Sequence, residues 1–309
     1  GADIVFKVRA PDAAELATYP KGAALLGLLD PYAAKAEAAA YAAAGVIAVA
    51  MEFVPRITRA QSMDVLSSQA NLAGYRAIIE GSQLYGRALP MMMTAAGTVA
   101  AAKVFVMGAG VAGLQAIATA RRLGGVVSAT DVRPASKEQV ASLGAKFIAV
   151  EDEEFKAAET AAGYAKPMSA EYQKKQAELV ASHIVKQDIV VTTALIPGRP
   201  APVLVTEAMV KSMRPGSVVV DLAVTQGGNC TLSKPDQVID VNGVKVIGFT
   251  NLPGRIAADA SALYARNLLA LLPLLTGENA AFAPKWDDEI VKAAVLTKDG
   301  AVVHPALNS

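Results

Sequence analysis

The chain has 309 residues, a formal net charge of +1 at neutral pH and a single cysteine. This charge gives no electrostatic basis for binding nucleic acid or acidic lipid, and one cysteine excludes an internal disulfide and fits a reducing compartment. Hydrophobic residues make up 53% of the chain but aromatic residues only 5%. The apolar content is therefore mostly Ala, Val, Leu and Ile, which is typical of parallel sheets flanked by helices. We expect an α/β protein with two domains, and the sequence contains no predicted transmembrane helix or signal peptide.

The first 53 residues are expected to form scaffold strands and one helix. The predicted strands are Ile4 to Val8, Gly22 to Leu29 and Val46 to Phe53. An alanine-rich helix is predicted to begin at Asp30-Pro31, because Asp caps helices and Pro fits their first position. Since the sequence enters a strand almost at once, we expect the first domain to be incomplete at its N-terminal end.

A long helix is then predicted from about Arg59 to about Arg87, with a capping box formed by Thr58 and Gln61. Polar residues recur along it at helical spacing, namely Gln61, Asp64, Ser67, Ser68 and Asn71. Such a stripe is either a solvated helix face or a binding surface. In the second case Arg56 could bind a pyrophosphate or carboxamide oxygen, or could instead pair with Asp64, and Gln61 could pair with a ribose or a carboxamide. The spacing alone leaves both interpretations open.

The stretch from Lys103 to Arg133 has the order strand, glycine turn, helix, strand and acid. Gly108 permits a tight turn, Gly110 lets the backbone approach a pyrophosphate, and Gly113 lets the helix pack closely on the strand. Asp131 can accept hydrogen bonds from the adenosine ribose hydroxyls and would repel a 2′-phosphate, which favours NAD over NADP. The alternative is a glycine-rich turn in an α/β sheet that binds no nucleotide.

Further strands are predicted at Lys146 to Val150, Asp188 to Thr193, Ser217 to Ala223 and Val244 to Phe249. Loops at the carboxyl ends of parallel strands are where such sheets bind ligands. The loop from Thr160 to Met168, which carries Tyr164, is predicted to be either a mobile loop or an ordinary surface loop. The predicted cofactor-binding residues are Gly108, Gly110, Val111, Ala112, Gly113, Asp131, Val132, Arg133, Tyr164, Thr193, Ala194, Leu195, Gln226, Gly227 and Asn229.

Residues 254–309 are expected to form a helix from Arg255 to Leu275 and a hairpin with an Asp299-Gly300 turn. This segment is predicted to pack back on the first 60 residues. The expected domains are therefore 1–66 together with 254–309, and 67–253.

The sequence offers no obvious group for moving a proton. His183 lies within a predicted helix beside apolar residues, His304 lies near the end of the chain, and Cys230 has no visible base partner. No cluster of residues is spaced to bind a metal. A dinucleotide site without a general base is consistent with direct hydride transfer between two nicotinamides, and equally with a regulatory NAD-binding protein.

The segments at 56–75 (RITRAQSMDVLSSQANLAGY) and 90–98 (PMMMTAAGT) resemble the NAD(H)-binding component of proton-translocating nicotinamide nucleotide transhydrogenase. The shorter segments at 163–166 (GYAK), 193–198 (TALIPG), 221–224 (DLAV) and 227–229 (GGN) resemble it too. The similarity covers nearly the whole chain.

The resemblance implies two Rossmann-like domains with a cleft between them and a homodimer. It also implies a complex with a separate NADP(H)-binding component and a membrane-spanning proton channel, at the cytoplasmic side of the bacterial inner membrane. The catalytic residues that it implies are Arg56, Gln61, Asp64 and Ser67, which would hold the nicotinamide end of NAD(H), with Gln61 nearest the hydride. Tyr164 would belong to a loop that closes on the nucleotide, and Asp131 would bind the adenosine ribose.

The amino-acid dehydrogenases of the alanine type are the alternative enzyme class. They would require a substrate-binding Arg and Lys and a catalytic His in the first domain. Residues 1–60 contain no histidine, and the segment at 56–75 stands where that family has a different loop.

Overall fold

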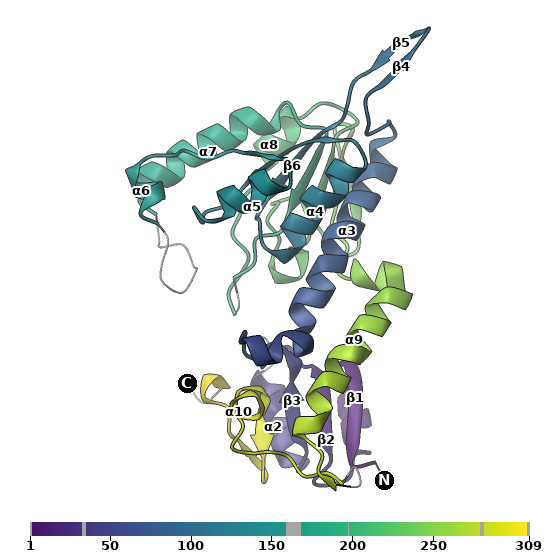
Figure 1. Cartoon of the computed structure of the whole chain (residues 1–309), viewed down its shortest axis with the longest axis vertical. Coiled ribbons are helices and arrows are strands. Elements are labelled where there is room, and N and C mark those ends of the chain that lie inside the picture. The colour runs from purple at the N-terminus through teal and green to yellow at the C-terminus, as the bar shows by residue number, and fades with distance from the viewer. Residues whose placement is uncertain (1, 33–34, 159–167, 197, 279–280, 308–309) are drawn as a thin grey trace. The chain divides into compact units, whose positions relative to one another are not determined.

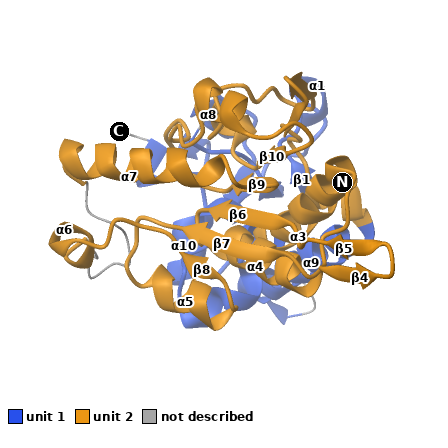
Figure 2. Cartoon of the chain, turned by 90° about the horizontal axis from the view of Figure 1, so that it is seen from above, with its two compact units in different colours: residues 1–69, 258–309 blue, residues 70–257 orange. Residues whose placement is uncertain are grey.

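The computed structural model describes residues 2–32, 35–158, 168–196, 198–278 and 281–307. It divides the chain into two compact units (Figure 2). Unit 1 consists of Gly1–Gln69 and Ala258–Ser309, and unit 2 of Ala70–Ala257.

Unit 2 is built on a seven-stranded sheet with the order β11-β12-β10-β9-β6-β7-β8. The strands are β6 (Lys103–Met107), β7 (Val126–Thr130), β8 (Lys146–Phe147), β9 (Ile189–Thr192), β10 (Val218–Asp221), β11 (Val238–Val241) and β12 (Val244–Ile247). From β6 the chain adds β7 and β8 on one side and β9, β10 and β12 on the other, which is the doubly wound arrangement. The predicted α/β class is confirmed. The sequence did not predict β11, which pairs antiparallel with β12 at the sheet edge.

Helices cover both faces of this sheet (Figures 1 and 2). One core cluster joins the strands to α3 (Val65–Tyr85), α4 (Val111–Arg122) and α5 (Ser136–Ser142). A second cluster joins the other face to α7 (Ala170–Ile184) and α8 (Glu207–Ser212). The short helix α6 (Glu153–Lys156) is capped by Asp152. Strand side chains such as Val106, Val191 and Val219 are fully buried, and each contributes about 1.5–3 kcal/mol by leaving water.

Unit 1 contains a parallel sheet of three strands, β1 (Ile4–Arg9), β2 (Ala24–Leu28) and β3 (Ile47–Ala50). Its helices are α1 (Ala13–Leu16), α2 (Lys35–Ala43), α9 (Ala257–Leu271, which begins at the unit boundary) and α10 (Glu289–Ala294). The hairpin of β13 (Thr297–Lys298) and β14 (Ala301–Val302) has the predicted turn, with φ of +51° at Asp299 and +75° at Gly300. The hydroxyl of Thr297 donates to Val46 O and accepts from Ala48 N, so this C-terminal segment packs beside β3.

The start of the predicted long helix is wrong. Residues Thr58–Met63 form a 3-10 helix, η2, and the α-helix α3 begins only at Val65. Asp64 separates them with a ψ of +87°, and its Oδ1 accepts from Ser67 N at 2.9 Å. The helix cap is therefore Asp64 rather than Thr58, and the polar residues from Gln61 onward do not share one face of an α-helix.

The predicted helix start at Asp30-Pro31 is also wrong. Asp30 has a φ of +48° rather than the extended backbone of a cap. Its backbone N–H donates to Glu52 Oε1 at 2.7 Å. Glu52 lies in the 3-10 helix Met51–Phe53, so the strand predicted to reach Phe53 ends at Ala50.

Two further features of the fold are a projecting hairpin and the lack of a membrane-spanning helix among the described residues. In unit 2 the hairpin β4 (Met92–Thr94) and β5 (Gly97–Val99) projects away from the sheet (Figure 1). Within the ranges that the structure describes, no helix combines the length and the apolar character needed to cross a bilayer.

Candidate functional site

The turn after β6 has a geometry that only glycine permits at two positions. Gly108 has a φ of +104°, and a Cβ there would lie 2.5 Å from Thr193 Oγ1. A Cβ on Gly113 would lie 1.8 Å from the carbonyl oxygen of Gly108. Close packing of the first turn of α4 on β6 therefore depends on both glycines.

Gly110 is different, because no atom lies within 4 Å of the position that its Cβ would take. It precedes α4 and provides no side-chain cap, so the first backbone N–H groups of the helix, at Val111, Ala112 and Gly113, have no capping side chain. Uncapped N–H groups and the positive end of the helix dipole attract phosphate. This open, exposed corner therefore fits the pyrophosphate of a dinucleotide.

Asp131 follows β7 and lies beside this turn. Its Oδ2 accepts from Ala109 N at 2.7 Å, and its Oδ1 accepts from Arg133 N and Nε, both at 2.9 Å. Burial opposes ionisation of the carboxyl, but the hydrogen bonds from Arg133 and Ala109 outweigh it, so the pKa of Asp131 is lowered. The group is an anion at neutral pH, and Val132 beside it is exposed.

The predicted residues of unit 2 that the structure describes follow the carboxyl ends of the strands or begin α4. Met107 at the end of β6 is in register with Thr130 of β7 and Thr192 of β9, so Gly108, Asp131 and Thr193 follow neighbouring strand ends. The gap between β6 and β9 is where the strand order reverses, which is the usual ligand position in such sheets. Leu195 is exposed just beyond it.

Asn229 lies in this region but does not face solvent. It is fully buried, its Oδ1 accepts from Ala194 N at 3.0 Å, and its Nδ2 donates to the carbonyls of Ala194 and Pro202, both at 2.8 Å. With its amide occupied in this way, Asn229 holds the loop after β9 in place. Gln226 and Gly227, in contrast, are exposed.

The loop that carries Asn229 is itself held by a residue that the site prediction omitted. Asp221, at the end of β10, is fully buried. Its Oδ2 accepts from Cys230 N at 3.0 Å and from Ser233 Oγ at 2.6 Å, and its Oδ1 accepts from Ala223 N at 2.9 Å. An acid that directly follows a buried apolar strand was the available sequence signal.

In unit 1 the four predicted catalytic residues line one pocket of about 270 Å³. Both the hydroxyl and the backbone N–H of Ser67 donate to Asp64, at 2.6 and 2.9 Å. Arg56 and Gln61 are exposed, and within the described chain neither side chain has a hydrogen-bond or ion-pair partner. Asp64 and Ser67 are therefore fixed by each other, whereas Arg56 and Gln61 are available to bind a ligand.

Both histidines are occupied elsewhere. The Nε2 of His183 lies 2.8 Å from Ser128 Oγ and 3.1 Å from Gln187 Nε2, and His304 stacks on Phe53 with ring centroids 4.2 Å apart. Burial lowers the pKa of each histidine, so both are neutral at pH 7. Neither lines the pocket in unit 1.

The structure also gives no support for a cysteine nucleophile or, among the described residues, for a metal site. Burial raises the pKa of the Cys230 thiol, which makes a thiolate nucleophile unfavourable. Among the described residues no three His, Cys, Asp or Glu side chains are grouped to hold a metal. Tyr164 lies outside the described residues.

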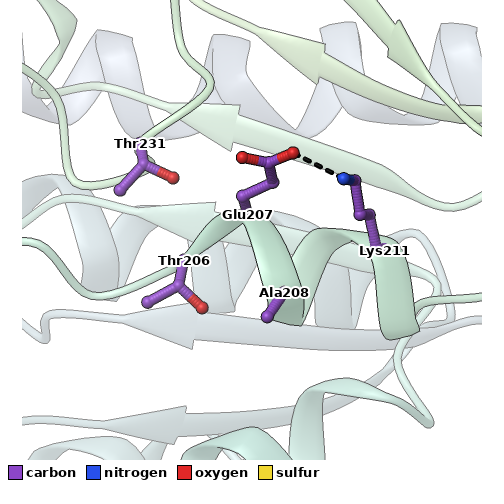
Figure 3. Close-up of a pocket in the computed structure, with 5 residues that line it drawn as sticks. All are labelled: Thr206, Glu207, Ala208, Lys211 and Thr231. Carbon is purple, nitrogen blue, oxygen red and sulfur yellow. Dashed lines mark ion pairs between the residues drawn. The ribbon is translucent and has the colours of Figure 1, made fainter.

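A larger hollow of about 570 Å³ lies beside α8 in unit 2 (Figure 3). Its lining residues are Thr206, Glu207, Ala208, Lys211 and Thr231, all exposed. Lys211 pairs with Glu207 at 2.6 Å, so the two charged groups satisfy each other. None of the predicted site residues that the structure describes lines this hollow.

A glycine turn at the switch point of a doubly wound sheet defines the class of dinucleotide-binding α/β proteins. Residues 1–73 match the family model "Alanine dehydrogenase/PNT, N-terminal domain", and residues 77–305 match "Alanine dehydrogenase/PNT, C-terminal domain". The chain is 57% identical to the first portion of NAD(P) transhydrogenase subunit alpha of Rhodospirillum rubrum, over 99% of this chain and 81% of that protein. It is 49% identical to the protein of the same name from Rickettsia prowazekii, over 98% of this chain and 79% of that protein.

Solved structures agree with this relationship. The transhydrogenase structure from Sinorhizobium meliloti is 61% identical, with a TM-score of 0.89 over 98% of this chain and 81% of that one. An L-alanine dehydrogenase structure is 24% identical with a TM-score of 0.78, over 99% of this chain and 80% of that one, and shows the shared fold. The chain belongs to the alanine dehydrogenase/PNT family, and within it to the NAD(P) transhydrogenase alpha subunits, which confirms the predicted resemblance.

Proposed function

We propose that this chain is the NAD(H)-binding component of a proton-translocating transhydrogenase, and that it holds NADH for direct hydride transfer to NADP⁺ on a separate component. The reaction is NADH + NADP⁺ ⇌ NAD⁺ + NADPH. The observation that carries the proposal is the pocket of Arg56, Gln61, Asp64 and Ser67, which none of the described histidine, lysine or cysteine residues lines. Its one carboxylate, that of Asp64, is occupied by Ser67.

The adenosine and pyrophosphate end of NADH is assigned to unit 2. The open space at Gly110 and the uncapped N–H groups of α4 suit the pyrophosphate. The ionised Asp131 disfavours a 2′-phosphate. Ribose hydroxyls would bind it by replacing the Arg133 side-chain donors that now contact both of its oxygens. Val111, Val132, Thr193, Leu195, Gln226 and Gly227 are assigned to the surrounding surface, Ala194 and Asn229 to its support, and Tyr164 to a loop over the nucleotide.

The nicotinamide end is assigned to the pocket of unit 1. Gln61 can donate to the carboxamide oxygen and accept from its NH₂ group, and Arg56 can donate to the carboxamide or to a phosphate. Asp64 holds the Ser67 hydroxyl in one orientation. The hydride carries both electrons from one nicotinamide C4 to the other, so no proton passes to the protein. The chain's contribution is to position the ring and exclude water.

The partners follow from the same relationship. The names of the relatives from Rhodospirillum rubrum and Rickettsia prowazekii describe each of them as one portion of a transhydrogenase alpha subunit. For this chain we propose a homodimer that joins an NADP(H)-binding component and a membrane-spanning proton channel at the cytoplasmic face of the membrane.

A mixing experiment tests this function. The chain, with NADH, is mixed with a transhydrogenase NADP(H)-binding component loaded with NADP⁺, and hydride transfer is followed optically. We expect transfer in this mixture and no turnover with alanine and NAD⁺, or with pyruvate, ammonia and NADH. Turnover of those substrates would instead support the alanine dehydrogenase class, whose members from Bacillus subtilis and Staphylococcus aureus are 27% and 29% identical. NADH binding without either activity would support a regulatory protein.

Nucleotide choice should depend on Asp131. We expect Asp131→Asn to weaken NADH binding about 10- to 100-fold, because charge-assisted hydrogen bonds contribute roughly 1.5–3 kcal/mol. The substitution should also reduce the ratio by which the chain binds NADH more tightly than NADPH. Fluorescence titration with both nucleotides measures this. Since the pKa of Asp131 is lowered from 3.8, wild-type affinity should not change through loss of this charge between pH 8 and 5. The exposed acid Asp240, paired with Lys245, provides the control Asp240→Asn; equal effects of the two substitutions would contradict the assignment.

The hairpin β4–β5 is the expected dimer contact. Met91, Met92 and Met93 are 62%, 43% and 78% exposed, and apolar side chains of this size are unfavourable in water unless covered. Replacing all three with Ser should weaken the dimer by at least about 100-fold, at roughly 1.5–3 kcal/mol per buried side chain, without loss of NADH binding. Sedimentation analysis measures this, with exposed Val203→Ser as the control. A triple variant as dimeric as the wild type would exclude the hairpin as the contact.

A further inference from the structure

Asn267 of α9 is a buried polar residue within an apolar part of unit 1. Its exposure is 7%, and Tyr264, Leu268 and Leu271 of the same helix belong to the surrounding core cluster. A buried side-chain amide is costly unless its donor and acceptor groups find partners. The partners of Asn267 therefore indicate what the residue stabilises.

Both partners lie next to pocket residues. Asn267 Nδ2 donates to the carbonyl oxygen of Ser62 at 2.8 Å, and its Oδ1 accepts from Ser68 Oγ at 2.8 Å. Ser62 directly follows Gln61, and Ser68 directly follows Ser67. One side chain thus bonds the backbone before Asp64, at the Ser62 carbonyl, and a side chain after it, the Ser68 hydroxyl.

The segment Thr58–Met63, which Asn267 contacts through Ser62, is only weakly stabilised by its own hydrogen bonds. η2 is a 3-10 helix, whose hydrogen bonds are poorer than those of an α-helix, and Ile57 before it provides no side-chain cap. Its inward anchors are Ala60 and Met63, 1% and 6% exposed. Because Gln61 has no side-chain partner among the described residues, its position depends on the backbone that Asn267 holds.

We propose that Asn267 is a positioning residue for hydride transfer: by bonding the Ser62 carbonyl and the Ser68 hydroxyl it fixes the segment that presents Gln61 and Ser67. The proposal rests on the proposed function. It assigns to Asn267 an effect on the transfer step and not on the adenosine end of NADH, which is bound by unit 2.

Asn267→Leu keeps a similar volume and removes both hydrogen bonds. We expect single-turnover hydride transfer to the NADP⁺-loaded partner component to fall roughly 10- to 100-fold, the usual result of misplaced reacting groups, while the dissociation constant for NADH changes less than about threefold. Backbone amides of residues 58–64 should exchange hydrogen faster. Ser68→Ala removes one of the two bonds and should show a smaller loss of the same kind, which keeps the test available if Asn267→Leu folds poorly.

The matched control is Thr297→Val. Thr297 is also fully buried in unit 1 and makes two hydrogen bonds, to Val46 O and from Ala48 N, but neither involves η2. It should lower the melting temperature without slowing transfer. Equal losses of transfer in the Asn267 and Thr297 variants, or wild-type transfer by both Asn267→Leu and Ser68→Ala, would overturn the proposal. A wild-type chain that binds NADH and transfers no hydride would overturn the proposed function and this role with it.

Discussion

Gln61→Asn should slow single-turnover hydride transfer about 100-fold while the affinity for NADH changes only a few-fold. The substitution keeps the amide but shortens the side chain by one methylene, which withdraws it from the nicotinamide by roughly 1 Å. A displacement of that size costs roughly 10²-fold in a reaction that depends on alignment. Binding is affected less, because we propose that the adenosine and pyrophosphate contacts lie in unit 2. Stopped-flow mixing with the NADP⁺-loaded partner component, beside an NADH titration, separates the two quantities.

The control for this experiment is Gln139→Asn, the same chemical change at an exposed position of α5. It should leave both quantities at wild-type values. Unchanged transfer by Gln61→Asn would show that Gln61 is a solvated residue and not part of the reaction site. Equal losses of affinity and rate would place it among the general binding contacts.

Gly110→Ala should abolish tight NADH binding in a chain that folds normally. The φ of Gly110 is −77°, and no atom lies within 4 Å of the added Cβ. Replacing Gly110 at this helix-capping position should therefore lower the stability of the folded chain by no more than about 1 kcal/mol. If the pyrophosphate approaches this backbone, the methyl group occupies its place, and affinity should fall roughly 100-fold, or about 2.7 kcal/mol. Calorimetry gives the stability, and fluorescence titration gives the affinity.

Gly113→Ala is the informative comparison. Its Cβ would lie 1.8 Å from the carbonyl oxygen of Gly108, so this chain should lose about 1–3 kcal/mol of stability or more through overpacking. The two variants thus separate an open binding surface from a packing contact. Wild-type affinity in the Gly110 variant would show that the nucleotide does not pass over the turn.

The sequence predicted those parts of the fold that depend on local patterns. Continuous apolar runs identified β6, β9 and β10, and glycine spacing identified the turn at Gly108. The edge strand β11 was missed because its residues alternate between exposed and half-buried. The hairpin β4–β5 was missed because its methionines are exposed rather than packed.

The pocket was harder to predict because its geometry departs from helical spacing. Asp64 sits at a helix-compatible position in the sequence, but its carboxylate caps the backbone N–H of Ser67 and so begins α3 six residues later than predicted, at Val65 rather than Arg59. The supporting residues were not predictable from local patterns. Asn267 reaches partners 205 and 199 positions away along the chain, and Asn229 reaches Ala194 across 35. Such contacts arise only from the folded structure.

Isotope transfer tests the central claim, which is that the hydride passes directly from one nicotinamide to the other. The chain is given NADH carrying deuterium at the transferred C4 position and mixed with the NADP⁺-loaded partner component in ordinary water. Mass spectrometry of the product NADPH should show one deuterium per molecule formed, with none lost to solvent. NADPH without the label would contradict the account, because the hydrogen would then have exchanged with solvent between the two nicotinamides instead of passing directly from one C4 to the other.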